Sequence, residues 1–336
     1  MSTESSSYTI QYPKDSIVSE DQKIPYELDE RLGKAIEVAI TLNMPLLLTG
    51  EPGTGKTRLA DKIAADLNAA EPAFLPSPLV FHTKTTSSAR ELFYQYDALR
   101  HFHEANLQKG DNKELKTSDY ISLQALGEAI ALSNPNEIGK SYLDAQYTQA
   151  RSSVVLIDEI DKAPRDFPND ILAEIERFQF EVKEDKNYRI QKGPEQQIVV
   201  VMTSNSEKNL PEAFLRRVIF YHIDFPKTKQ LIRIVNAHLN AGKDASDTDP
   251  RKQQNIQQLV RHFEQIRGVV RKKKPATAEL IAWIRILEMQ GILQKDLDIN
   301  ALSRESETWK LLERSYSILA KTQVDLQAIL EMDPNI

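Results

Sequence analysis

The chain has 336 residues, of which 40% are hydrophobic and 27% charged, and it contains no cysteine. This composition is that of a globular protein long enough for two domains, and the lack of cysteine excludes disulfide frameworks and thiolate metal sites. A formal net charge of −6 argues against nonspecific nucleic-acid binding as the main activity. Because no apolar run could cross a bilayer and no secretory signal is present, we expect a cytoplasmic protein without a membrane partner.

The first part of the chain predicts a leader, a helix and a strand. Residues 1–24 show no apolar period, and we expect them to form a flexible leader. Apolar residues then recur at spacings of three and four from Leu28 to Ile40, which predicts an amphipathic helix. The apolar run over residues 45–49 predicts a buried strand.

The most informative stretch follows that strand and fits the pattern G-x-x-x-x-G-K-[ST] at every fixed position. Its residues, together with the residue that continues into the expected helix, are Gly50, Glu51, Pro52, Gly53, Thr54, Gly55, Lys56, Thr57 and Arg58. Glycines let the backbone approach a phosphate, so that successive N–H groups at a helix N-terminus bind it. Lys56 would reach the β- and γ-phosphates, and the Thr57 hydroxyl would hold Mg²⁺. The alternative is an ordinary Gly-rich turn, but the strand before the pattern and the helix after it favour a nucleotide phosphate site.

The next part of the chain predicts one strand and two helices. The strand spans residues 79–82, and Ser88 with Glu91 three residues later predicts the start of a helix. A second helix is expected over residues 120–132. The apolar residues of the first helix are more typical of core packing than of a substrate-binding surface. They are Leu92, Phe93, Tyr96, Leu99 and Phe102.

The second strong motif is an apolar strand over residues 154–157 that ends in two carboxylates, Asp158 and Glu159. In an open α/β sheet, ligands bind at the carboxyl ends of buried parallel strands. Asp158 would hold Mg²⁺ through water, and Glu159 would polarise the attacking water molecule. An apolar run that ends in Asp-Glu is common by itself, but roughly a hundred residues after a phosphate loop it is informative.

Polar residues also follow the last two expected strands. A helix over residues 170–180 and a hairpin over residues 181–197 lead to a strand over residues 198–203. Asn205, just after it, either caps a turn or holds the attacking water or the γ-phosphate beside Glu159.

Two adjacent arginines, Arg216 and Arg217, precede a last strand over residues 218–223. They are either a solvated surface pair or supply the guanidinium that stabilises a phosphoryl transition state across a subunit boundary.

The chain from Pro226 onward is helical in pattern, with helices expected over residues 229–239, 256–266 and from about residue 277. The basic run over residues 271–274 either forms a solvated loop or supplies one cationic side chain that contacts the γ-phosphate. An apolar stripe from Trp309 to Leu330 predicts a terminal helix that pairs within the chain or with a neighbour. We therefore expect a leader over residues 1–24, a nucleotide-binding α/β core over 25–225 and a helical lid over 226–336.

Taken together, the motifs within residues 46–57, 157–164 and 205–213 resemble those of an AAA+ ATPase, and more narrowly of its MoxR-type, dynein-related branch. The resemblance covers roughly residues 24–289. It implies a P-loop NTPase fold, with a parallel five-stranded sheet in the order 5-1-4-3-2 sandwiched by helices and an all-α lid after it. It also implies a ring, usually a hexamer, that hydrolyses ATP with Mg²⁺ and acts like a chaperone on a partner. Such partners often contain a von Willebrand factor A-type domain.

The resemblance also assigns roles to residues of the phosphate loop and of the strand ends. Walker A, Walker B and sensor 1 correspond, in that order, to Lys56 with Thr57, Asp158 with Glu159, and Asn205.

The arginine finger of the family follows a Leu-Pro-Glu-Ala segment and is normally preceded by Asp. Arg217 occupies the finger position, but Arg216 stands where the Asp would be, which leaves open which arginine acts. Arg271 and Lys274 are the candidates for sensor 2.

Three other functions remain open on the sequence. A phosphotransferase would have a phosphate loop but would not need the set formed by Asp158, Glu159, Asn205 and Arg217. A nucleotide-dependent switch that scaffolds partners with little hydrolysis would not need the carboxylate of Glu159. A GTP-dependent motor subunit of a restriction-like system would carry an Asn-x-x-Asp guanine signature, and because no clear one is present, ATP is favoured.

Overall fold

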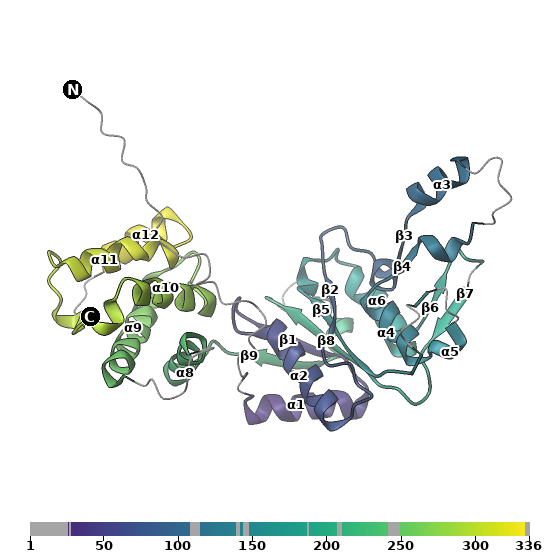
Figure 1. Ribbon diagram of the computed structural model, residues 1–336, viewed down its shortest axis with the longest axis horizontal. Coiled ribbons are helices and arrows are strands. Elements are labelled where there is room, and N and C mark those ends of the chain that lie inside the picture. Colours follow the sequence, from purple (N-terminus) through teal and green to yellow (C-terminus); the bar gives the residue numbers. More distant parts are fainter. Residues whose placement is uncertain are drawn as a thin grey trace. The chain divides into compact units, whose positions relative to one another are not determined.

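The structure is a computed structural model that describes residues 26, 28–107, 115–138, 142–143, 148–186, 188–206, 210–240 and 249–332. The expected leader over residues 1–24 lies outside these residues. The described chain divides into two compact units, an α/β unit that ends at Phe225 and a helical unit that begins at Pro226 (Figure 1). None of the described helices combines the length and the apolar character needed to cross a membrane.

A five-stranded parallel sheet forms the centre of the α/β unit, with its strands in the order β2-β5-β8-β1-β9. Counted along the chain and read from β9, this order is 5-1-4-3-2, so the P-loop NTPase type of sheet predicted from the sequence is confirmed. The strands are β1 (Leu46–Gly50), β2 (Leu79–His82), β5 (Ser153–Asp158), β8 (Ile198–Ser204) and β9 (Ile219–Ile223).

Helices cover both faces of the sheet. Successive strand residues point to opposite faces, so Leu46 and Leu48 pack in one core cluster and Leu47 in the other. The first cluster lies under α1 (Glu30–Leu42) and α2 (Lys56–Ala70), and the second under α4 (Ala125–Ser133) and α6 (Phe167–Arg177). Burial on both faces explains why β1, β5 and β8 are continuous apolar runs.

The helix start predicted at Ser88 and Glu91 is confirmed, but the long helix predicted to follow it is wrong. A 3-10 turn, η2 (Ala89–Leu92), leads into strand β3 (Tyr94–Tyr96), and helix α3 (Ala98–Leu107) begins only after it. The strand forms because Tyr94–Tyr96 pairs antiparallel with β4 (Ile121–Leu123), a partner distant in sequence that a local pattern does not reveal. The helix expected over residues 120–132 therefore begins later, at Ala125.

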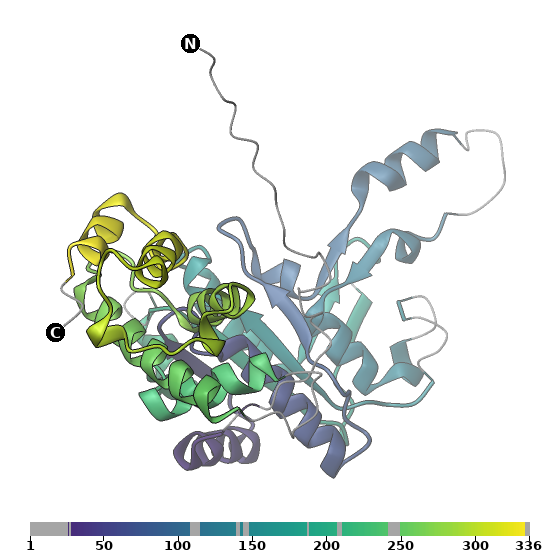
Figure 2. The same cartoon turned by 60° about the vertical axis from the view of Figure 1, so that its left-hand side comes forward.

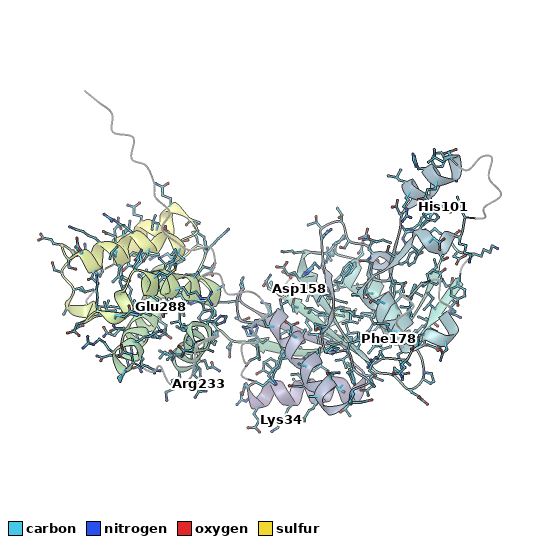
Figure 3. All side chains as sticks on the ribbon, viewed as in Figure 1. Lys34, His101, Asp158, Phe178, Arg233 and Glu288 are labelled. Atoms are coloured by element: carbon cyan, nitrogen blue, oxygen red, sulfur yellow. The ribbon has the colours of Figure 1, made fainter. Side chains whose placement is uncertain are left out.

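Helix α3 stands away from the sheet (Figures 1 and 2) and buries none of its residues. Leu99 and Phe102, expected in the core, are 84% and 71% exposed, whereas Leu92 and Phe93 are buried as expected. His101 of α3, labelled in Figure 3, contacts the 3-10 turn η3 (Thr117–Tyr120). Its ring stacks on the ring of Tyr120, with 4.3 Å between the ring centroids. The apolar stripe is thus split between the core and solvent.

A hairpin follows α6, as predicted for residues 181–197, and consists of β6 (Gln179–Val182) and β7 (Tyr188–Gln191). Helix α6 ends at Arg177, before the predicted end, because Phe178 adopts a left-handed conformation with φ 44°. Three further short elements of this unit are α5 (Pro135–Ile138), η4 (Ile160–Lys162) and α7 (Glu212–Leu215).

The helical unit consists of helices and 3-10 turns around its own core. It contains α8 (Thr228–Leu239), α9 (Pro250–Val269), α10 (Thr277–Met289), η5 (Ile292–Gln294), η6 (Ile299–Ala301), α11 (Glu307–Ser315), η7 (Tyr316–Ile318) and α12 (Gln323–Leu330). The prediction of a single terminal helix from the apolar stripe is therefore wrong, because η7 and the turn after it separate α11 from α12. Trp309, Leu312, Tyr316 and Leu319 are buried, so these stripe residues pack within the unit.

A buried carboxylate shapes the basic turn before α10. The backbone N–H groups of Arg271, Lys272 and Lys273 donate to the carboxylate of Asp325 at 3.0–3.1 Å. Burial raises the pKa of Asp325, but these hydrogen bonds and one from Thr322 outweigh it and lower the pKa. The side chains of residues 271–274 are all exposed, as expected of a solvated loop.

His262 of α9 is a second buried titratable group, and it should make the stability of the protein depend on pH. Its Nε2 lies 2.7 Å from the Tyr316 hydroxyl, and burial lowers the pKa of His262 from 6.5 to about 4, although a hydrogen bond with Gln265 acts in the opposite direction. As the pH falls through this range, the unfolded chain binds a proton that the folded chain does not. We therefore expect the free energy of unfolding to fall by up to roughly 3 kcal/mol between pH 6.5 and pH 4 because of this group.

Urea unfolding of the wild type and of His262→Gln at a series of pH values measures this contribution. The difference in unfolding free energy between the two proteins should change with pH in that window. A difference that stays constant with pH would show that His262 makes no such contribution.

Candidate functional site

The predicted phosphate loop connects β1 to α2 and depends on glycines at two positions. Gly50 has φ 151°, and a Cβ there would lie 2.5 Å from the carbonyl oxygen of Ile223 on β9. Gly55 has φ 87°, and a Cβ there would lie 2.9 Å from the ring of Tyr26. A side chain at either position would meet the backbone of β9 or the ring of Tyr26, so only glycine allows the loop to turn closely past them to the N-terminus of α2.

Lys56, the first residue of α2, is 7% exposed and returns over the loop. Its Nζ donates to the carbonyl oxygens of Gly50 at 2.8 Å and Glu51 at 3.0 Å, and to Asn205 Oδ1 at 3.1 Å. Burial lowers the pKa of Lys56, while the carboxylates of Asp161, Asp158 and Glu159 oppose this shift. The loop thus presents an ammonium group and helical N–H groups together, which suits a phosphate anion.

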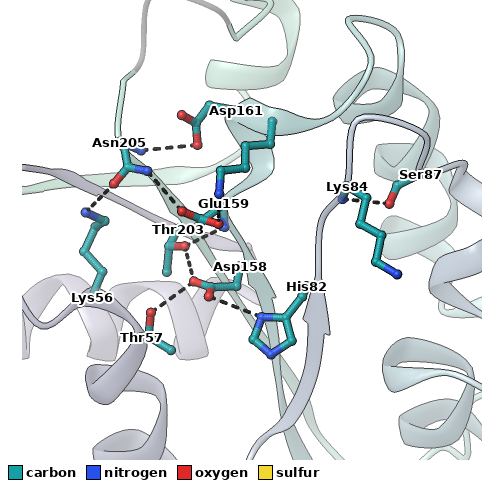
Figure 4. Close-up of polar contacts among 11 residues, drawn as sticks. Lys56, Thr57, His82, Lys84, Ser87, Asp158, Glu159, Asp161, Thr203 and Asn205 are labelled. Carbon is teal, nitrogen blue, oxygen red and sulfur yellow. Dashed lines mark hydrogen bonds and ion pairs between the residues drawn. The ribbon is translucent and has the colours of Figure 1, made fainter. Parts of the chain in front are cut away.

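Asp158, at the carboxyl end of β5, lies at the centre of a polar cluster (Figure 4). Its Oδ1 accepts hydrogen bonds from Thr57 Oγ1 at 3.1 Å and Thr203 Oγ1 at 2.6 Å. His82 Nδ1, at the end of β2, lies 3.5 Å from Oδ2. The Thr57 hydroxyl donates its hydrogen to Asp158 and keeps its lone pairs, so this hydroxyl and this carboxylate form the kind of oxygen donor set that Mg²⁺ prefers.

Glu159 follows Asp158 in a left-handed conformation, φ 57° and ψ 49°, which costs about 1–3 kcal/mol for a residue with a side chain. Its N–H donates to Thr203 Oγ1 at 2.8 Å. Its carboxylate forms an ion pair with Lys162 and accepts from Asn205 Nδ2 at 3.4 Å. The structure therefore brings Glu159 and Asn205 together, as predicted from the ends of their two strands (Figure 4).

The paired arginines lie in other surroundings. Arg216 is 76% exposed and forms an ion pair with Glu212 on α7, and Arg217 is 57% exposed with its Nε 3.7 Å from Glu176 on α6. Neither of these contacts involves the cluster around Asp158. The sensor 2 candidates, Arg271 and Lys274, lie in the exposed basic turn of the helical unit.

Sequence reasoning missed several residues that contact the cluster. The Thr203 hydroxyl donates a hydrogen bond to Asp158 and accepts one from the backbone N–H of Glu159. The sequence feature that could have identified Thr203 is a hydroxyl at the end of an otherwise apolar strand. Asp161 accepts from the backbone N–H of Asn205 at 3.3 Å, and Lys162 pairs with Glu159. Nothing in the local pattern marked Tyr26, whose ring packs against the phosphate loop.

Comparison with known proteins identifies the family. Residues 46–227, more than half of the chain, match the model of the ATPase family associated with various cellular activities (AAA). No curated protein matches the sequence. Among solved structures, the chain resembles one from work on the structural basis for katanin self-assembly, at 14% identity and a TM-score of 0.39 over 94% of this chain and 85% of that one. The family match, together with the P-loop sheet and the loop that follows β1, shows that the chain belongs to the AAA family of ATPases.

Proposed function

We propose that the protein hydrolyses ATP with Mg²⁺ as a MoxR-type AAA+ ring protein and uses the turnover to remodel or activate a partner protein. The observation that carries the proposal is the convergence of two loop residues on two strand ends. Thr57 reaches Asp158 at 3.1 Å and Lys56 reaches Asn205 at 3.1 Å. A phosphate-binding loop beside a carboxylate and an amide can bind the phosphates and Mg²⁺ and orient a water molecule, which supports phosphoryl transfer to water.

Each residue of the cluster has a separate task in this proposal. Lys56 and the N–H groups of the loop would bind the β- and γ-phosphates, and Thr57 with Asp158 would hold Mg²⁺. Mg²⁺, when bound, neutralises charge that develops on the phosphate oxygens. Glu159 would orient a water molecule and accept its proton, and Asn205 would hold that water or the γ-phosphate.

The assembly is part of the proposal. An exposed guanidinium, Arg217 or its neighbour Arg216, would complete the site of an adjacent subunit in a ring, for which the family resemblance implies a hexamer. The helical unit, residues 226–336, would act as a lid, with Arg271 or Lys274 as the γ-phosphate sensor. A partner with a von Willebrand factor A-type domain is the expectation from the MoxR-type branch.

Replacement of Lys56 tests the phosphate site. Lys56→Ala removes a buried ammonium group that would contact two phosphates, and we expect ATP affinity to fall by at least about a hundredfold, or roughly 3 kcal/mol. Titration with a fluorescent ATP analogue measures the loss. Lys62→Ala is the matched control. Lys62 lies on the same helix, but its Nζ forms an ion pair with Asp66 Oδ1 at 2.6 Å on the solvent-exposed side of that helix. Equal affinity of Lys56→Ala and the wild type would reject the site.

A further inference from the structure

The carboxylate of Glu159 is held at both of its oxygens. Oε2 forms an ion pair with Lys162 Nζ, and Oε1 accepts from Asn205 Nδ2 at 3.4 Å. Lys162 is the last residue of η4, the 3-10 turn that begins directly after Glu159. The 3-10 turn therefore brings the ammonium group of Lys162, three residues after Glu159, back to the Glu159 carboxylate.

Asn205 connects this pair to the phosphate loop. Its Oδ1 accepts from Lys56 Nζ at 3.1 Å, and because an ammonium group can only donate, the amide NH₂ faces Glu159, which can only accept when ionised. A continuous series of contacts thus runs from Lys56 through Asn205 and Glu159 to Lys162. Within this series, the Glu159 carboxylate is contacted directly by Asn205 and by Lys162.

The two contacts on Glu159 differ in strength. The bond from Asn205 is long at 3.4 Å, whereas the contact with Lys162 joins two opposite charges and is the stronger kind of hydrogen bond. The backbone of Glu159 is fixed by its N–H bond to Thr203, so the remaining freedom lies in the side chain. Lys162 is therefore the main restraint on the direction of this carboxylate.

We propose that Lys162 is a positioning residue for ATP hydrolysis, one that holds the Glu159 carboxylate in the direction from which it acts on water. The inference rests on the proposed function. A carboxylate has about four lone-pair sites, and the two contacts leave others free for a water molecule. Loss of the ion pair frees the carboxylate to rotate, and general-base catalysis depends steeply on such geometry.

Lys162→Met tests the proposal, because it removes the charge and nearly retains the length of the side chain. We expect kcat to fall about tenfold, while KM for ATP and the affinity for a fluorescent ATP analogue stay within about twofold of the wild type. Lys162→Arg retains a cation and should recover most of the lost kcat. Lys162 is 52% exposed, so neither variant should unfold the protein. Lys62→Met, which breaks the exposed ion pair with Asp66, is the control and should leave kcat unchanged.

A double-mutant cycle separates positioning from a general structural effect. If Lys162 acts through Glu159, adding Lys162→Met to Glu159→Gln should lower the residual turnover no further. An unchanged kcat in Lys162→Met, or an equal loss in both backgrounds, would overturn the inference alone. A wild-type protein that releases no phosphate from ATP would overturn the proposed function and this inference with it.

Discussion

Arg217→Ala should lower the rate of ATP hydrolysis by roughly 10³- to 10⁵-fold and leave ATP binding unchanged, because the guanidinium would offset charge on the γ-phosphate of a neighbouring subunit only in the transition state. The change should cost little stability. Arg217 is 57% exposed, and its Nε lies 3.7 Å from a Glu176 that is itself exposed. Steady-state turnover and equilibrium ATP binding, measured on the same preparation, give both quantities.

Mixing variants tests whether Arg217 acts across a subunit boundary. Arg217→Ala and Lys56→Ala should each be nearly inactive, but in mixed rings some subunits with an intact Lys56 lie beside a neighbour with an intact Arg217. Partial activity should therefore return on mixing. Arg216→Ala, which removes the ion pair with the exposed Glu212, is measured in parallel because Arg216 is the other candidate for the finger. If activity stays at zero at every ratio although mixed rings form, Arg217 does not act in trans, and repeating the mixture with Arg216→Ala assigns the finger.

Glu159→Gln should lower the rate of hydrolysis about a hundredfold or more while ATP still binds. Glutamine nearly retains the shape of the side chain and can accept from Asn205, but it does not accept a proton from water and loses its ion pair with Lys162. Single-turnover measurements with radioactive ATP give the rate of the chemical step and show that ATP persists on the variant.

The control for this variant is Asp66→Asn, which neutralises an exposed carboxylate of α2 that pairs with Lys62. It should hydrolyse ATP at the wild-type rate. Hydrolysis by Glu159→Gln at that same rate would remove Glu159 from its assigned role.

The central sheet and the phosphate loop could be predicted because their signals are local. Residues 198–203 read as a strand, since a strand buried on both faces is an apolar run bounded by turn residues. Residues 79–82 read as a strand from their apolar run, although this strand lies at the edge of the sheet and is partly exposed. Lys56 and Thr57 are predicted by a fixed spacing of glycines, because the backbone at Gly50 and Gly55 has positive φ and passes too close to its neighbours for a side chain.

The features that the sequence did not reveal depend on contacts between distant segments. Tyr94–Tyr96 forms a strand only because β4 lies beside it. Thr203 reaches Asp158 because the register of β5 and β8, in which Ile157 pairs with Met202, brings their next residues together. Leu99 and Phe102 share the spacing of core residues, yet the direction in which a helix face points is set by the rest of the fold.

In the proposed reaction, this AAA protein transfers the γ-phosphate of ATP to water. The purified protein is incubated with γ-labelled ATP, with Mg²⁺ and with a chelator, and free phosphate, ADP and labelled protein are measured. We predict equal amounts of phosphate and ADP, loss of the activity with the chelator, and a rate per subunit that rises with protein concentration as subunits assemble. Label on an acceptor instead of in free phosphate, or ATP that binds and is never cleaved, would contradict the claim.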